Sequence, residues 1–299
     1  MYILEVINIQ IRKLVKSGAA SHTLALPSDW IKKNKLKKGD LLYIVEKNNE
    51  LRISTEEKAP KKSNKEITIK IDDQEINTIR RKTISSYINN YSIFTFHGES
   101  LNKKLEDIRK ILDNFLALEI IEQTTTKLVA KDFLNIQEFS LKNTIRRMDM
   151  LARSIITDAK QGKESAASLE FRDYEVDKLF FLISRLTRSN LEDPASSTPH
   201  IRSMSTWWMA KNLESIADAA KNLSKTFNED IKDIYEEIES YYQECIKSYI
   251  KEDKELADKL INKRISLLKK TDNIKNENKH LLKSMINSSR NIAKIILDS

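Results

Sequence analysis

The segment SLKNTIRRMDMLARSIITDA, residues 140–159, repeats an apolar side chain every three or four positions. This spacing gathers the apolar residues on one face of an α-helix and leaves charged residues on the other. Ser140 directly precedes the stripe and is a suitable N-cap. Because an amphipathic helix must bury its apolar face, the segment predicts part of a helical bundle. The stripe consists of Leu141, Ile145, Met148, Leu151, Ile155 and Ala159.

The same periodicity continues to the end of the chain and predicts five more helices. The segment AKNLSK at 220–225, near the end of the third helix, is echoed by SRNIAK at 289–294, near the end of the sixth. An echo at this distance indicates a duplicated unit. We therefore predict two tandem three-helix bundles, over 140–228 and 229–299. The five further helices are expected at about 164–190, 203–227, 229–251, 254–272 and 277–298.

The half of the chain that precedes the bundles has a different pattern. Residues 1–58 are mainly short alternating stretches typical of strands, with one short helix after Pro27. Residues 59–65, APKKSNK, have the composition of a linker. Residues 66–139 alternate strand and helix patterns, which predicts a small α+β connector domain.

Composition excludes several classes of protein and of site. Four glycines and four prolines argue against Gly-rich phosphate loops, and a single cysteine, Cys245, excludes a disulfide framework. The four histidines are scattered, and no nucleophile–base arrangement has a recognisable spacing, so we expect no enzyme. No apolar run is long enough for a membrane span, and the N-terminus does not resemble a signal peptide. These features predict a cytoplasmic protein without membrane insertion.

Positive charge is concentrated at the N-terminus. Residues 1–66 hold 14 Lys and Arg against 8 Asp and Glu, whereas the whole chain has a net charge of +8. A local basic excess is typical of a protein that binds nucleic acid or another anionic surface, although it is also compatible with a solvated basic face.

The N-terminal segments RKLVKSG (12–18), SHTLALP (21–27), WIKK (30–33) and LKKGD (36–40) resemble the SpoVT/AbrB-like DNA-binding domain. The resemblance implies a swapped-hairpin β-barrel made by two chains, and hence a homodimer that binds double-stranded DNA. Ala19-Ala20 departs from the family because the turn after Gly18 lacks a basic residue, which puts base recognition there in doubt. The basic residues that match in position are Arg12, Lys13, Lys16, Lys32 and Lys33.

In the helical half, RDYEVDKLFFLISR (172–185) and AKNLESIADAAKNL (210–223) resemble the PhoU family of phosphate-uptake regulators. That resemblance implies tandem three-helix bundles and a metal cluster of iron, zinc, manganese or magnesium, either divalent or ferric. Its motif residues here are the pairs Asp173/Asp177 and Glu214/Asp218. Residues four apart project from one helix face, so two such pairs can place four carboxylates around a hard or borderline cation.

Two observations limit the expectation of a metal cluster: the number of acidic pairs that occur by chance, and the residues of the second bundle. About six acidic pairs with this spacing are expected at random in a chain of this composition. Aligning the two echoes, and aligning the preceding helices in parallel, places non-carboxylate residues at all four motif positions of the second bundle, so we predict a cluster in the first bundle alone. The aligned residues are Lys263 for Asp173, Leu267 for Asp177, Lys283 for Glu214 and Asn287 for Asp218.

The connector resembles the segment found in archaeal PhoU-like proteins with an AbrB-like head. Its matching stretches are IDDQEINTIRR (71–81), YINNYSIF (87–94) and LEIIE (118–122). The expected fold is therefore multidomain and mainly α, with a small swapped-hairpin β-barrel head, an α+β connector and two PhoU-like bundles.

Three functions follow from these expectations. The first is a DNA-binding transcriptional regulator of phosphate uptake whose bundles sense a metal or a partner. The second is an adaptor that binds a phosphate ABC transporter or a sensor protein such as a kinase, with the barrel serving only to dimerise. A metalloenzyme at the four carboxylates is the least favoured, because no histidine has ligand spacing and carboxylates alone specify no reaction.

Overall fold

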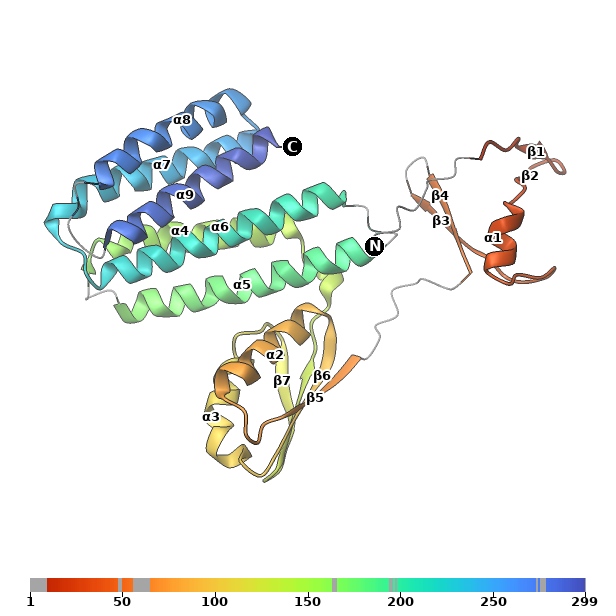
Figure 1. Ribbon diagram of the computed structural model, residues 1–299, viewed down its shortest axis with the longest axis horizontal. Helices are drawn as coiled ribbons and strands as arrows, with labels where there is room; N and C mark the ends of the chain where they lie inside the picture. Colours follow the sequence, from red (N-terminus) through yellow and green to blue (C-terminus); the bar gives the residue numbers. More distant parts are fainter. Residues whose placement is uncertain are drawn as a thin grey trace, which may run out of the picture. The chain divides into compact units, whose positions relative to one another are not determined.

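The computed structural model describes residues 10–47, 50–55, 65–162, 166–193, 196, 198–272, 274 and 278–298 (Figure 1). The chain divides into two compact units, residues 1–61 and 62–299. Helices dominate, and the strands of the described residues lie in the head and the connector, so the predicted mainly helical fold with a small N-terminal β region is confirmed. Part of the predicted linker 59–65 lies outside the described residues.

The N-terminal unit, called the head below, contains two separate two-stranded antiparallel hairpins on either side of a short helix. Its first two strands are shorter than the sequence pattern predicts, and no closed barrel is formed by the described residues of this single chain. The elements are β1 (Val15–Lys16), β2 (His22–Thr23), α1 (Ser28–Lys33), β3 (Tyr43–Lys47) and β4 (Glu50–Ser54).

The head has no buried side chain among its described residues. Several large apolar side chains are instead exposed, including Ile11 at 90 %, Leu41 at 78 % and Leu14 at 67 %. A two-stranded hairpin is marginally stable in water unless an apolar face is covered. The described part of one copy of the head therefore lacks a core of its own.

The connector is a four-stranded sheet with helices on one face. Its order is β5-β6-β8-β7, with β5 and β6 parallel and the other neighbours antiparallel. Ile69, Phe96 and Leu128 lie side by side across three strands and are buried beneath the helices. The elements are β5 (Lys65–Lys70), α2 (Ile76–Ile88), β6 (Tyr91–His97), α3 (Leu101–Leu112), β7 (Leu118–Gln123) and β8 (Lys127–Asp132).

Six long helices follow a short 3-10 turn, η1 (Ile136–Glu138). Ser140 is the N-cap of the first helix, as predicted, but its side chain makes no capping hydrogen bond. The Ser140 carbonyl accepts hydrogen bonds from the backbone N–H and from Oγ1 of Thr144, both at 2.9 Å. Another 3-10 turn, η3 (Glu229–Ile231), separates the two groups of three. The helices are α4 (Leu141–Ala159), α5 (Ala166–Glu192), α6 (His200–Ser224), α7 (Lys232–Lys251), α8 (Lys254–Thr271) and α9 (Asn278–Leu297).

Within each group every helix contacts the other two, and the groups are joined by α6 packing on α9 (Figure 1). Asn291 of α9 donates to Asn212 of α6 at 3.1 Å in this contact. Both groups share one hydrophobic core. None of the helices in the described part of the chain is both long and apolar enough to cross a membrane.

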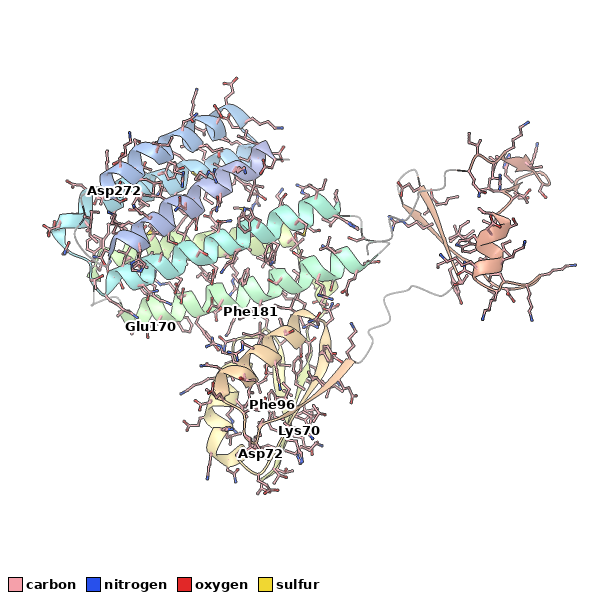
Figure 2. All side chains as sticks on the ribbon, in the orientation of Figure 1. Lys70, Asp72, Phe96, Glu170, Phe181 and Asp272 are labelled. Atoms are coloured by element: carbon pink, nitrogen blue, oxygen red, sulfur yellow. The ribbon has the colours of Figure 1, made fainter. Side chains whose placement is uncertain are left out.

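The connector packs on α5 through α2 and through aromatic side chains. Phe181 lies on the side of α5 that faces the connector, whereas Phe96 lies inside the connector (Figure 2). The ring of Phe181 is 5.5 Å from that of Phe115, which in turn is 4.5 Å from that of Tyr87. This chain of rings fixes one face of α5 against the connector.

Candidate functional site

The four carboxylates predicted as metal ligands lie on two helices that pack together. Asp173 and Asp177 project from α5, and Glu214 and Asp218 project from α6. Asp173 is only 8 % exposed, whereas the side chain of Asp218 is 53 % exposed. The group therefore runs from the helix–helix interface out to solvent.

A lysine from α6 lies between the two helices. The Lys221 ammonium donates to Asp173 Oδ2 at 2.5 Å and is 2.9 Å from Asp218 Oδ1. A second lysine, Lys211, donates to Glu214 Oε2 at 2.6 Å. We call Asp173, Asp177, Glu214, Asp218 and Lys221 the carboxylate cluster.

Burial and mutual repulsion perturb the carboxyl groups of this cluster. Burial, followed by the negative charges of Asp173 and Glu214, raises the pKa of Asp177 to about 7. Burial also raises the pKa of Asp173, against the opposing effect of its bond to Lys221. Burial lowers the pKa of Lys221, but its bonds to Asp173 and Asp218 outweigh this and raise it to about 12.

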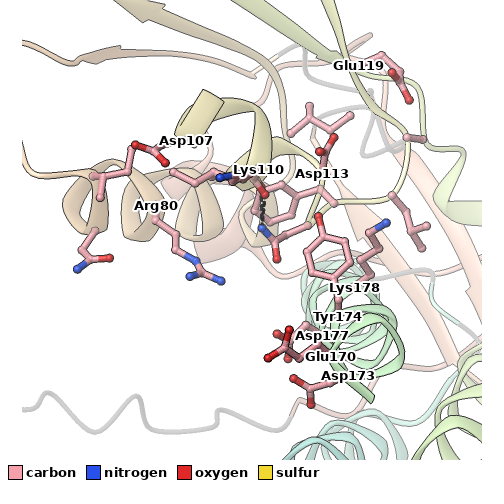
Figure 3. Close-up of a pocket in the computed structure, with 18 residues that line it drawn as sticks. Arg80, Asp107, Lys110, Asp113, Glu119, Glu170, Asp173, Tyr174, Asp177 and Lys178 are labelled. Carbon is pink, nitrogen blue, oxygen red and sulfur yellow. Dashed lines mark hydrogen bonds between the residues drawn. The ribbon is translucent and has the colours of Figure 1, made fainter. Parts of the chain in front are cut away.

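The buried end of the cluster opens into a pocket of about 940 Å³ between the connector and α5. Figure 3 shows Glu170, Asp173 and Asp177 gathered on α5, with the Tyr174 ring beside them and Arg80 of α2 on the opposite wall. The amine of Lys178 lies 4.7 Å from the centre of the Tyr174 ring. The connector, in which the sequence showed no chemistry, therefore forms one wall of the candidate site.

The donor set of the cluster suits a hard or borderline cation, because it consists of carboxylate oxygens. Asp173 Oδ1 is buried without a hydrogen-bond partner in the described structure, which leaves one oxygen available for a ligand. The side chains are nevertheless not arranged as a complete metal-coordination site. Among the residues that the structure describes, no three carboxylate, imidazole or thiol groups converge closely enough to hold a metal ion.

The residues predicted to contact DNA are all exposed in the head. Arg12 donates to Gln10 Oε1 at 2.6 Å, and Lys16 lies in β1. Lys32 and Lys33 occupy the last turn of α1, while Lys13 precedes β1. Their side chains can therefore reach solvent, as contact with a phosphate backbone requires.

At the aligned positions of the second helical group, ion pairs and core packing replace the carboxylates. Lys263 donates to Glu244 of α7 at 3.0 Å, and Lys283 donates to Asp272 at 2.8 Å. Leu267 is fully buried, and Asn287 accepts from Arg264 at 2.7 Å.

Sequence reasoning missed Lys221 and Arg80. Lys221 stands three residues after Asp218 and seven after Glu214, so it shares their helix face, and this spacing was a usable signal. Arg80 had no comparable signal, because only the docking of α2 on α5 brings it to the pocket.

Comparison with known proteins gives one match. A family model described as PhoU domain matches residues 141–227, which comprise α4, α5 and α6. The matched segment contains all four candidate metal ligands and Lys221. No curated protein and no solved structure matches the chain.

Proposed function

We propose that this chain is a dimeric DNA-binding regulator of phosphate homeostasis whose first helical group senses a cation. The observation that carries the proposal is the joint presence of a PhoU-domain match and a basic head without a core. The match suggests the regulatory role in phosphate homeostasis. The head supplies the reason to expect a second copy of the chain and an anionic partner.

Dimerisation is supported by the apolar side chains that one copy of the head leaves in water. Ile11, Leu41, Ile44 and Leu51 are each more than 60 % exposed. Two short hairpins and a helix of six residues cannot cover them within one chain. A second head offers the same hairpins, so a symmetric pair can bury both sets at once.

DNA binding is supported by the positive charge of residues 1–66, net +6, and by the exposure of the five predicted contact residues. A dimer would present ten such side chains. Lysine and arginine contacts to phosphates release counterions, so affinity should fall steeply with salt. Arg12 can also read a base edge, because its guanidinium offers two parallel donors.

A cation bound at the carboxylate cluster would reduce the electrostatic repulsion between its carboxylates. Asp173, Asp177, Glu214 and Asp218 would hold it, and the unpartnered Asp173 Oδ1 is the oxygen best placed to accept it. Asp173 and Asp177 also line the pocket formed with α2 and α3. A change in the charge of the cluster would therefore act directly on the connector.

Fluorescence anisotropy with a labelled duplex across a salt series tests the proposal. The duplex is the region upstream of the chain's own gene or of a phosphate-transport gene, with a scrambled duplex as reference. The variant replaces all five predicted contact residues by alanine in the full chain. We expect tight, salt-sensitive binding for wild type and a salt slope reduced by several units in the variant.

The matched control removes five exposed lysines from outside the head and should leave the salt slope unchanged. No binding by a folded dimer at low salt would overturn the DNA-binding proposal. Equal affinity with and without Mn²⁺ would overturn the coupling between cation and DNA. The control residues are Lys103, Lys247, Lys251, Lys259 and Lys269.

The second candidate is an adaptor that binds a phosphate transporter or sensor protein through its helices. It is favoured by an exposed apolar stripe on α6, formed by Ile201, Met204 and Trp208 at helical spacing. The absence of a basic residue in the turn after Gly18 also favours it. Failure to bind DNA, with the dimer intact, would make this the leading function.

A further inference from the structure

Lys221 places its ammonium between the carboxylates of the two helices that form the carboxylate cluster. Its ammonium contacts one carboxylate from each helix, Asp173 of α5 and Asp218 of α6. The Lys221 side chain is only 17 % exposed, so it lies among the carboxylates of the cluster and not on the protein surface. It thereby supplies positive charge to oxygens that otherwise repel each other.

The compensation by Lys221 is incomplete. The four carboxylates carry up to four negative charges, of which Lys221 neutralises one and Lys211, paired with Glu214 at 2.6 Å, neutralises another. Asp173 uses Oδ2 for Lys221 and leaves Oδ1 buried without a partner, although the residue is 92 % removed from solvent. A buried acceptor without a donor is unfavourable, so a cation that contacts both oxygens of Asp173 in place of the ammonium would be stabilised.

We propose that Lys221 is the resident counter-ion of the cluster and that a divalent cation binds there only by displacing its ammonium. Lys221 then determines both the affinity and the valence of the cation accepted. This inference rests on the cation site of the proposed function and assigns its regulation to one residue.

The selection of valence follows from counting charge. A monovalent cation that displaces Lys221 replaces one positive charge with another and breaks two ion pairs in doing so. A divalent cation adds one positive charge to the cluster, and carboxylate oxygens are its preferred ligands. The site should therefore respond to Mn²⁺ or Mg²⁺ and ignore Na⁺ and K⁺.

Titration calorimetry of the full chain with Mn²⁺ tests this inference through two variants with opposite effects. Lys221→Gln removes the competing charge, and we expect at least tenfold tighter Mn²⁺ binding than in wild type. Lys221→Arg keeps the charge and can bind a carboxylate through two N–H groups, so we expect weaker Mn²⁺ binding than in wild type. The matched control is Lys178→Gln on α5, whose amine pairs with Glu175 at 3.1 Å. It removes a nearby positive charge without touching the cluster, and we expect less than a threefold change.

A second measurement uses wild-type protein and therefore does not depend on the folding of any variant. Amine acetylation, read by peptide mass spectrometry, should label Lys221 several times faster when Mn²⁺ is present, because the displaced ammonium reaches solvent. Labelling of Lys178 should stay constant. Labelling of Lys221 that is unchanged or slower with Mn²⁺ would overturn the inference.

The outcomes separate this inference from the proposed function. Mn²⁺ binding that is equally tight or weaker in Lys221→Gln leaves the cation site intact but removes the role of Lys221. Absence of Mn²⁺ binding in wild type and in all variants overturns the cation site and the inference together. DNA binding by the head is measured separately and can succeed in either case.

Discussion

Arg185 of α5 donates to Asp132 at the end of β8 at 2.5 Å, and the side chains of both residues are 4 % exposed. Arg185 also donates to Asn90 Oδ1 at 3.0 Å and lies 4.6 Å from the centre of the Tyr87 ring. One buried side chain thus joins the first helical group to three parts of the connector. The pocket beside the carboxylate cluster depends on this junction, because its two walls belong to the two domains that Arg185 connects.

Replacing Asp132 by alanine should strongly destabilise the protein. The change leaves the Arg185 guanidinium buried without its counter-ion, and loss of one partner of a buried pair costs about 3–5 kcal/mol. Urea denaturation followed by circular dichroism measures the effect. The matched control is Arg188→Ala, which breaks an ion pair with Glu192 whose side chains are nearly half exposed, and should cost less than about 1 kcal/mol. Equal losses in the two variants would show that the junction contributes no more than a surface pair.

The helical half of the fold was predictable because each helix carries an apolar stripe that is visible in the chain itself. The six long helices lie close to their predicted ranges for this reason. The junction between connector and α5 was not predictable, because Asp132 and Arg185 stand 53 residues apart and no local pattern pairs them. The sequence pattern predicted more strand in the head than the structure has. The alternation of apolar and polar residues covers Ile11–Lys16, but only two of these residues form β1.

Asp177 should make the stability of the metal-free protein depend on pH. Its folded pKa of about 7 lies above the unfolded value of about 3.9. When the pKa of a carboxyl group is higher in the folded than in the unfolded state, the protein becomes less stable as pH rises from the unfolded pKa through the folded pKa. Asp177→Asn does not titrate, so with EDTA it should gain about 1–3 kcal/mol over wild type at pH 8 and almost nothing at pH 4.

Chemical denaturation at pH 4, 6 and 8 gives the comparison with wild type. Glu175→Gln on the same helix is the matched control and should show no gain at pH 8, because it removes a carboxylate that is paired with Arg147 and Lys178. A gain for Asp177→Asn of the same size at pH 4 and pH 8 would contradict a raised pKa. With Mn²⁺ added, the gain at pH 8 should disappear if Asp177 is a ligand of the proposed cation, because its ionised carboxylate is then stabilised by the metal.

The candidate site was predictable only in part. Spacing of four residues placed each carboxylate pair on one helix face, and α5 and α6 do pack together. The bond between Lys221 and Asp173 joins residues 48 apart, so it depends on the relative rotation of two helices. Sequence periodicity indicates which face of each helix is apolar, but it does not show which polar side chains meet across the interface.

Introducing a charge into the exposed apolar surface of the head should prevent the proposed dimerisation. Ile44 on β3 is 62 % exposed in the single chain, and burial against a second head would make an aspartate there unfavourable. We expect Ile44→Asp to elute as a monomer in size-exclusion chromatography with light scattering, with its helical circular dichroism retained. Ile265→Asp on α8, at a site 56 % exposed, should stay dimeric. A dimer in the Ile44→Asp variant would place the interface elsewhere.

The difference between the two helical groups predicts one cation site in each chain. At the aligned positions the second group has Lys263 and Lys283, each already paired with a carboxylate of its own group. A cation there would meet two fixed positive charges and no free carboxylate pair. Calorimetry should therefore give one Mn²⁺ per chain, and Asp173→Asn with Asp177→Asn should abolish it. Glu244→Gln, which removes the partner of Lys263, should leave the stoichiometry unchanged. Two equivalent Mn²⁺ ions per chain would show that the second group binds metal through residues outside the aligned positions.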